Sequence, residues 1–387
     1  MKEKEDEILY LLNELSDIII GSALGLSGLI PFVHVNTIIE ILTKFNYTNS
    51  SFFIVSLVFA RLPLELLAAT RGLTGADIAI AINSFKRITN LELILFNCVA
   101  GMLVALALFP IFSIIAPPIY PIIRDVAPVA VAGVLLWFLS TQKNKYAILI
   151  VMLSGAAGII ILSKNLNNGL LILLTGLYGA PSLLFEEKEE EKPSVEDEQK
   201  TNSTSIAQKT KVGSLFLISI GSITGMASSF LPAMTPAMLA IVLLSFFSQS
   251  NQFASLYSGL IGSRAVSDFA AMEFLQKGRS GATATLLGEK FFSFTETYLL
   301  ILAGIAVTIV FCFLAIKLNN IMPEFSKTTK RCFVLLMFIY IFYSDGFTGI
   351  AAFATCISIS LAATVFKVGK PALGGSIAFA AIRNYFP

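Results

Sequence analysis

Long apolar runs, interrupted by few charges, constrain the fold of this chain more than any other feature. Such runs recur from residue 16 to the C-terminus, and about 20 helical residues cross the hydrocarbon core of a bilayer. Only 13% of the 387 residues are charged, whereas about 25% are charged in soluble domains. The sequence therefore predicts an all-α polytopic membrane protein.

The charges concentrate in two short stretches. Residues 1–7 carry six and residues 186–200 carry eleven, so 17 of the 52 charged residues occupy 22 positions. The second stretch continues into Ser, Thr and Gln, a composition typical of a disordered linker. We therefore predict an acidic N-terminal tail, a first membrane repeat, a charged disordered linker and a second membrane repeat, over residues 1–14, 15–185, 186–212 and 213–387.

The two membrane units share a motif. GSALGLSGLIPFVHVNT (21–37) resembles GSITGMASSFLPAMTPA (221–237), with the first glycines 200 positions apart. Apolar segments interrupted by Gly and Pro at corresponding places are typical of secondary transporters built from inverted repeats. We expect a two-fold internal repeat with broken or re-entrant helices and about 10–12 transmembrane segments. Close helix packing through small residues is the alternative explanation of the glycines.

The two motif copies supply candidate binding residues. A helix end inside the membrane attracts anions through its backbone N–H groups, and hydroxyl or amide groups beside the break can bind a ligand or cap the next helix. His34, the only histidine, suits proton transfer, but the second copy has no histidine. The candidates are Gly25, Gly28, Pro31, His34, Asn36 and Thr37 in the first copy, and Gly225, Ser228, Pro232, Thr235 and Pro236 in the second.

Charged residues within apolar runs are further candidates, because a charge is costly in a membrane. Arg264 and Asp268 are four residues apart, and we expect Arg71 and Asp77 to be their counterparts in the first half. An arginine binds carboxylate or phosphate through two parallel hydrogen bonds. We therefore predict that Arg71, Arg264 and Asp268 belong to a substrate site. A self-neutralising Arg–Asp pair is the alternative.

Arg61 and Glu65 have the same spacing within an apolar run. On a helix, residues four apart share a face and can neutralise each other. We interpret these two residues as a structural ion pair, with a ligand site as the alternative.

Several function classes are excluded. One histidine cannot make an HExxH motif or a histidine metal cluster, and neither GxSxG nor GxxxxGK[ST] occurs. We therefore expect no enzyme activity, catalytic residue, metal site or cofactor, apart from coupling Na⁺ or H⁺. Outside residues 1–7 and 186–200, the chain carries 22 basic and 13 acidic residues without a basic block, so nucleic acid is not an expected partner. Cys98, Cys312, Cys332 and Cys356 lack CxxC spacing and are expected core residues.

Three segments carry a family resemblance: GLSGLIPFVHVNTI, GLYGAPSLLF and GSRAVSDFAAMEFLQKGRSGA. They resemble the TctA family, the large membrane subunit of tripartite tricarboxylate transporters, and within it the shorter archaeal-type DUF112 group. The resemblance covers residues 15–385 and implies a carboxylate permease coupled to Na⁺ or H⁺. Where the family has a Pro-Gly signature, this chain has Pro31-Phe32 in the first copy and Pro232-Ala233 in the second, so the glycine is replaced in both.

The break in GSITGMASSFLPAMTPAML is also similar to that of the DUF368 family, which is implicated in returning polyprenyl-phosphate carriers across the membrane. We expect a multi-pass permease in the cell membrane of a prokaryote that moves an organic anion, preferentially a carboxylate, by alternating access. A polyprenyl-phosphate translocase is the alternative. The expected partners are a small anionic substrate or an anionic lipid, and the bilayer. The sequence leaves open whether the chain also binds a small membrane subunit or a second copy of itself.

Overall fold

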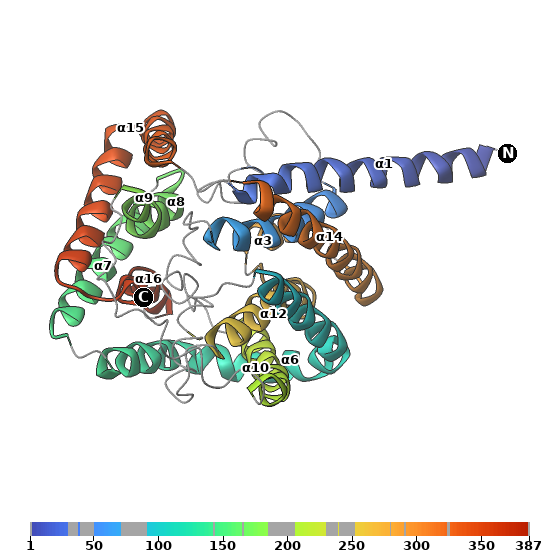
Figure 1. Ribbon diagram of the computed structural model, residues 1–387, viewed down its shortest axis with the longest axis horizontal. Helices are drawn as coiled ribbons and strands as arrows, with labels where there is room; N and C mark the ends of the chain where they lie inside the picture. Colours follow the sequence, from blue (N-terminus) through green and yellow to red (C-terminus); the bar gives the residue numbers. More distant parts are fainter. Residues whose placement is uncertain are drawn as a thin grey trace.

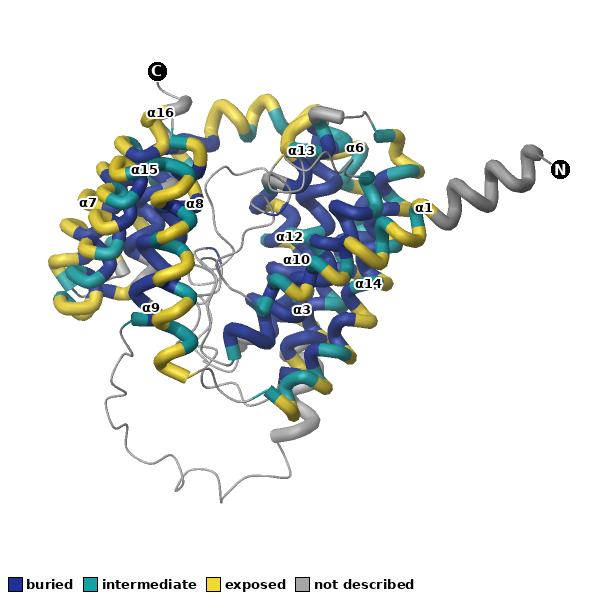
Figure 2. The backbone as a smooth tube through the Cα atoms, turned by 90° about the horizontal axis from the view of Figure 1, so that it is seen from above, coloured by how far each residue is buried: buried dark blue, intermediate teal, exposed yellow. Residues whose placement is uncertain are grey.

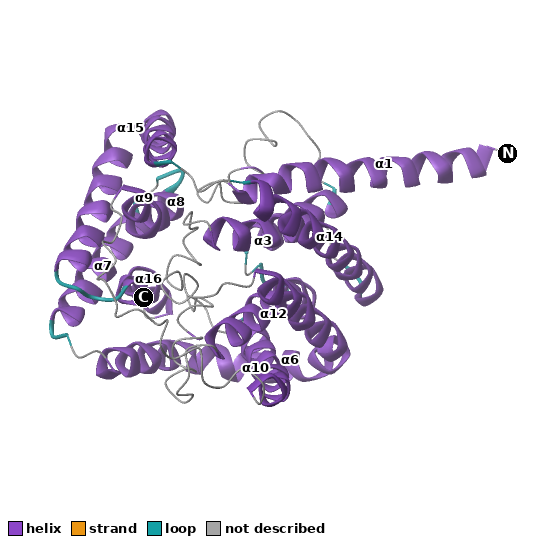
Figure 3. Ribbon diagram, viewed as in Figure 1, coloured by secondary structure: helices purple, strands orange, loops and turns teal. Residues whose placement is uncertain are grey.

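The computed structural model describes most of the chain, and the described part is helical (Figure 3). No β-strand occurs among the described residues, which confirms an all-α fold for them. They are residues 2–29, 38, 50–70, 91–141, 144–164, 166–184, 206–229, 239, 252–278, 280–289, 292–322 and 326–385.

Five of the described helices are long and apolar enough to cross a membrane. Large apolar side chains are exposed on four of these helices but not on α3 (Ser51–Thr70), and Figure 2 shows such exposed stretches on α7 (Tyr146–Ser163) and α15 (Lys327–Val365). Water disfavours such extended apolar surfaces, whereas lipid accommodates them. The helices therefore suit a polytopic membrane protein. They are α3 (Ser51–Thr70), α6 (Leu91–Thr141), α7 (Tyr146–Ser163), α14 (Phe294–Ile321) and α15 (Lys327–Val365).

The remaining elements pack between or beside these five helices. They are α1 (Lys2–Gly25), η1 (Leu26–Leu29), α8 (Gly169–Leu174), the π-helical turn η2 (Thr175–Gly179), α9 (Ala180–Leu184), α10 (Ile206–Ser228), α12 (Gln252–Leu275), α13 (Gly281–Glu289), η4 (Lys370–Gly374) and α16 (Gly375–Tyr385).

The helices gather in two bundles (Figures 1 and 2). In the first bundle, α1 and α14 pack on α3, while α10 and α6 pack on α12. In the second bundle, α16 packs on α7, while α8, η2 and α9 pack on α15. α6 belongs to both bundles, because it contacts α12 in the first and α16 in the second.

Local sequence signals explain how α14 and α15 begin and where α15 is interrupted. The hydroxyl of Ser293 accepts a hydrogen bond from the backbone N–H of Glu296, whose carboxylate accepts one from the backbone N–H of Ser293. This capping box starts α14. The hydroxyl of Ser326 caps α15 by accepting a hydrogen bond from the backbone N–H of Thr329. Gly346 has φ 61° and ψ −151°, a conformation that favours glycine, and it interrupts α15.

Two helices begin inside segments that the sequence predicts as polar stretches. α10 begins at Ile206, within the predicted linker (186–212). Ala207, Gln208 and Lys209 favour helices, and they let α10 start before the apolar run. The predicted acidic tail (1–14) forms the first part of α1. Residues 185–205 lie outside the described residues.

Glycines permit the closest helix contacts in the first bundle. A side chain at Gly262 of α12 would meet the carbonyl oxygen of Cys98 in α6, and one at Gly101 of α6 would meet the backbone of Gly259 in α12. Without a large hydrophobic force between helices in lipid, such close packing is a main source of association.

We predict that Gly262→Ala destabilises the protein by about 1–3 kcal/mol, because the added methyl group overlaps a backbone oxygen and pushes α6 from α12. The measurement is thermal unfolding in detergent. Gly133→Ala is the matched control, since its methyl group would meet nothing within 4 Å. Equal melting temperatures for the two variants would contradict the packing described here.

Candidate functional site

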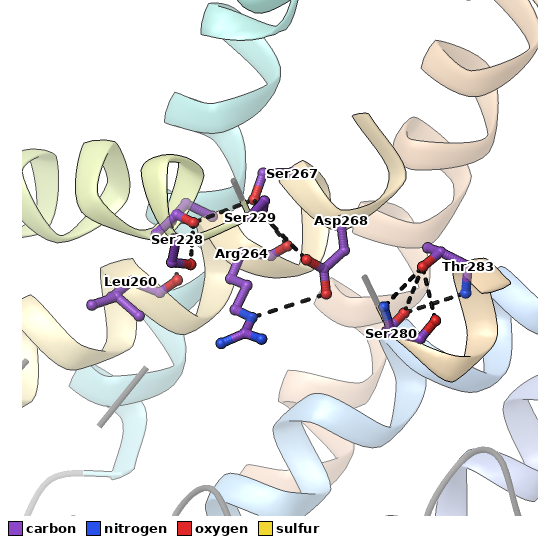
Figure 4. Close-up of polar contacts among 10 residues, drawn as sticks. Ser228, Ser229, Leu260, Arg264, Ser267, Asp268, Ser280 and Thr283 are labelled. Carbon is purple, nitrogen blue, oxygen red and sulfur yellow. Dashed lines mark hydrogen bonds and ion pairs between the residues drawn. The ribbon is translucent and has the colours of Figure 1, made fainter. Parts of the chain in front are cut away.

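Polar side chains cluster where the C-terminal end of α10 meets α12 (Figure 4). The Ser229 hydroxyl lies 2.6 Å from the Ser267 hydroxyl and donates to Asp268 Oδ1 at 3.2 Å. Arg264 Nε lies 4.0 Å from Asp268 Oδ2. Ser229, Ser267 and Asp268 are buried. We call these four residues the α10–α12 polar cluster.

Small residues on α10 bring the two helices close enough to form this cluster. A side chain at Gly221 would meet the carbonyl oxygen of Leu256, and one at Gly225 would meet the hydroxyl of Ser263. The Ser267 hydroxyl donates to the Gly225 carbonyl oxygen at 3.4 Å. The last turn of α10 is thereby joined to α12, and Ser229, which follows this turn, reaches Asp268.

The electrostatics of the cluster depend on how the Asp268 carboxylate is shared. One of its oxygens accepts from Ser229, while the other faces Arg264 at 4.0 Å, the outer limit of an ion pair. Burying a carboxylate is costly unless charges and hydrogen bonds compensate it. The Arg264 side chain is 26% exposed and that of Asp268 is 12% exposed.

A second Arg–acid pair lies on α3. Arg61 Nε contacts Glu65 Oε1 in a close ion pair, with side-chain exposures of 5% and 26%. The i, i+4 ion pair predicted from the sequence is therefore confirmed. A Cβ atom at Gly28 would lie 2.6 Å from the carbonyl oxygen of Arg61. The end of η1 thus lies against α3 at this pair.

Six of the predicted site residues lie among the described residues, and they form two groups. Gly25 and Gly28 lie against α3. Gly225 and Ser228 lie in the last turn of α10, where the Ser228 hydroxyl donates to the Gly225 carbonyl oxygen at 2.6 Å. Arg264 and Asp268 complete this second group from α12, which packs against α10. The remaining predicted residues lie outside the described residues: Pro31, His34, Asn36, Thr37, Arg71, Pro232, Thr235 and Pro236.

Arg61 and Arg264 stand at similar places in two helix–helix contacts, while Arg71 lies outside the described residues. Gly25 faces Ala60 and Gly225 faces Ser263, which immediately precede Arg61 and Arg264. The sequence contains this match: an arginine is followed four residues later by an acid at Arg61 and again, 203 positions later, at Arg264.

Sequence reasoning missed Ser229 and Ser267. Serine is frequent in this chain and in membrane helices generally, where it supports packing. Only the approach of α10 to α12 distinguishes these two hydroxyls from the other serines.

Among the described residues, no three His, Cys, Asp or Glu side chains are grouped so that they could hold a metal ion.

Comparisons with known proteins give one distant relative. An uncharacterized protein of Methanocaldococcus jannaschii, MJ1079, is 25% identical over 299 residues, which cover 72% of each chain. No family model matches the chain, and no solved structure is similar to it. The relative is archaeal, and its name states no activity, so residue roles must be argued from the geometry.

We predict that Ser229→Ala destabilises the protein by about 1–3 kcal/mol, because it removes a hydrogen bond from a buried carboxylate. Thermal unfolding measures the effect. Ser219→Ala is the control, since that hydroxyl bonds to Leu215 within its own helix. A melting temperature of Ser229→Ala as high as that of Ser219→Ala would show that the carboxylate does not depend on Ser229.

Proposed function

We propose that this protein is a secondary transporter that moves an organic anion, preferentially a carboxylate, across the cell membrane of a prokaryote. One observation carries the proposal: the α10–α12 polar cluster holds a partly exposed arginine among helices suited to a membrane. Charged residues at membrane depth are costly and mark ligand pathways. The planar fork of Arg264 matches the two oxygens of a carboxylate.

We further propose that the two halves form an internal repeat. Matching glycine contacts support it: Gly21 of α1 faces the Phe53 carbonyl on α3, and Gly221 of α10 faces the Leu256 carbonyl on α12. The glycines are 200 positions apart, and the residues that they face are 203 positions apart. An equivalent helix pair therefore opens each half.

Cross-packing between the halves supports the same proposal. α14 of the second half packs on α3, while α6 of the first half packs on α12. Gly304 of α14 faces Phe59, and Gly101 of α6 faces Gly259. These two contact glycines are again 203 positions apart, and each follows an alanine. Each half would thus cover the arginine-bearing helix of the other.

The direction of α7 and α15 supports an inverted repeat. Asn144, before α7, donates through Nδ2 to the carbonyl oxygen of Phe366, after α15, at 2.5 Å. Asp345, at the interruption of α15, accepts from the backbone N–H of Asn167, after α7, at 2.6 Å. α7 and the second part of α15 therefore run antiparallel. Residues 349–366, which follow α7 by 203 positions, overlap the second part of α15, and helices related by a repeat axis in the membrane plane are antiparallel.

This inverted arrangement predicts which loops share a side of the membrane. In a Cys332→Ser background, we expect Lys145→Cys and Lys367→Cys to react with an impermeant maleimide from one side. Lys164→Cys should react from the opposite side, because α7 separates it from Lys145. The other three cysteines are buried. Labelling of all three positions from the same side would contradict the arrangement.

The anion site is tested by thermal unfolding with citrate and shorter di- and tricarboxylates. A ligand at about 100 times its Kd adds about 2.7 kcal/mol of stability, so binding is readily detected. We expect Arg264→Ala to weaken carboxylate binding by about tenfold to a hundredfold, because charged hydrogen bonds are lost. Arg124→Ala is the control, since Arg124 pairs with Asp125 on an exposed surface. Wild-type binding by Arg264→Ala would overturn the proposed site.

The same assay separates the two substrate classes. Stabilisation by a carboxylate supports the permease. Stabilisation by a short-chain polyprenyl phosphate alone would overturn it in favour of a lipid-carrier translocase, because both ligands present an anion to Arg264 but only the second has a lipid tail.

A further inference from the structure

Two lysine-bearing loops, one from each half of the chain, meet where α7 begins and α15 ends. The Asn144 side chain donates through Nδ2 to the carbonyl oxygen of Phe366 at 2.5 Å and to that of Lys367 at 3.5 Å. The rings of Tyr146 and Phe366 stack, with centroids 4.5 Å apart and an interplanar angle of 17°. These contacts join the two loops and bring Lys145 and Lys367, both exposed, to one end of the helix pair.

The length of α7 places this end at the membrane surface. α7 has 18 residues, which rise about 27 Å along the helix axis, close to the thickness of the hydrocarbon core. Tyr146 is the first residue of α7 and is exposed, and tyrosines are enriched at the level of the lipid headgroups. Lys145, one residue earlier, therefore lies at headgroup level.

The chain around these contacts is basic. Residues 142–146 are QKNKY and residues 366–370 are FKVGK, so these ten positions contain four lysines and no Asp or Glu. The N-terminal end of α7 adds partial positive charge. By contrast, an acid lies at the opposite end of α7, where Asp345 accepts from the backbone N–H of Asn167. Clusters of four or more basic residues beside membrane helices attract anionic lipids.

Lys367 has a backbone conformation that favours glycine. Its φ is 54°, and a residue with a side chain is strained there. The turn that ends α15 is held by backbone bonds, from the N–H of Lys367 to the Thr364 oxygen at 3.0 Å and from the N–H of Val368 to the Ala363 oxygen at 2.8 Å. Glycine is the usual residue at such a helix end and makes the same bonds. The backbone of this turn therefore does not require the lysine side chain.

We propose that Lys145 and Lys367 bind the phosphate of an anionic lipid headgroup between the ends of α7 and α15. Ammonium groups bind phosphate as point charges. Large apolar side chains next to the lysines along the chain are exposed and suit the acyl chains of the same lipid, namely Ile148, Leu149 and Val365. The bound headgroup links a loop of the first half to a loop of the second. This site does not depend on the proposed anion transport, since Arg264 lies on α12 in the first bundle.

Thermal unfolding of the purified full-length protein in mixed micelles tests this site, with phosphatidylglycerol replacing phosphatidylcholine step by step. We expect phosphatidylglycerol to raise the melting temperature of the wild type. Each lysine near an anionic membrane surface contributes about fivefold in affinity, so Lys145→Gln/Lys367→Gln should bind phosphatidylglycerol about twentyfold to thirtyfold more weakly. The stabilisation should decrease as the salt concentration rises, because salt screens exposed charges.

Lys367→Gly separates lipid binding from a structural role of the lysine. Because this variant removes the strained conformation, it should melt no lower than the wild type in phosphatidylcholine alone. Its affinity for phosphatidylglycerol should nevertheless fall about fivefold. A variant that melts lower in phosphatidylcholine but keeps the wild-type affinity for phosphatidylglycerol would show that the lysine is structural, and it would overturn the site.

The matched control is Lys164→Gln/Lys277→Gln, which removes the same charge from two exposed lysines, one after α7 and one after α12. This control and Arg264→Ala should keep the wild-type response to phosphatidylglycerol. The lipid site is overturned if phosphatidylglycerol does not stabilise the wild type, or if Lys145→Gln/Lys367→Gln responds like the control. Equal stabilisation by soluble glycerol phosphate also overturns it, because the ligand would then not be a lipid.

Discussion

The close contact between a glycine-lined helix and an arginine-bearing helix is the interaction on which the first bundle depends. It occurs where α1 packs on α3 and where α10 packs on α12. A bilayer offers no water to solvate charges or backbone groups, so these must find partners within the protein. At the end of α10, this contact brings the Ser229 hydroxyl to the Asp268 carboxylate and leaves Arg264 at the rim of the cluster.

The two Arg–acid pairs have different consequences, although their spacing along the chain is the same. Arg61 is buried against Glu65, so the pair is closed and mainly stabilises α3. Arg264 is more exposed and stands farther from its acid, and Asp268 also bonds to Ser229. This asymmetry supports the second half as the place of anion binding.

Sequence patterns predicted the features that depend on local periodicity. Apolar run length predicted the membrane helices, because about 20 residues must cross the bilayer, and the spacing of Arg61 and Glu65 predicted their ion pair, because residues four apart share a helix face. The sequence predicts Arg71, 193 positions before Arg264, as its counterpart, whereas the glycine contacts match Arg264 with Arg61, 203 positions earlier, so the motif offset of 200 changes to 203 at the second helix. Such a shift becomes visible only when Gly25 and Gly225 are seen to face residues adjacent to the two arginines.

Residue order alone thus determined that this chain is helical, apolar and suited to a membrane, because these properties follow from composition and from spacing within single helices. The tertiary structure decided which helices meet. It placed Ser229 beside Asp268, and it packed α14 on α3 and α6 on α12. Contacts between helices depend on which faces approach each other, and residues far apart in the chain carry no local signal of that approach.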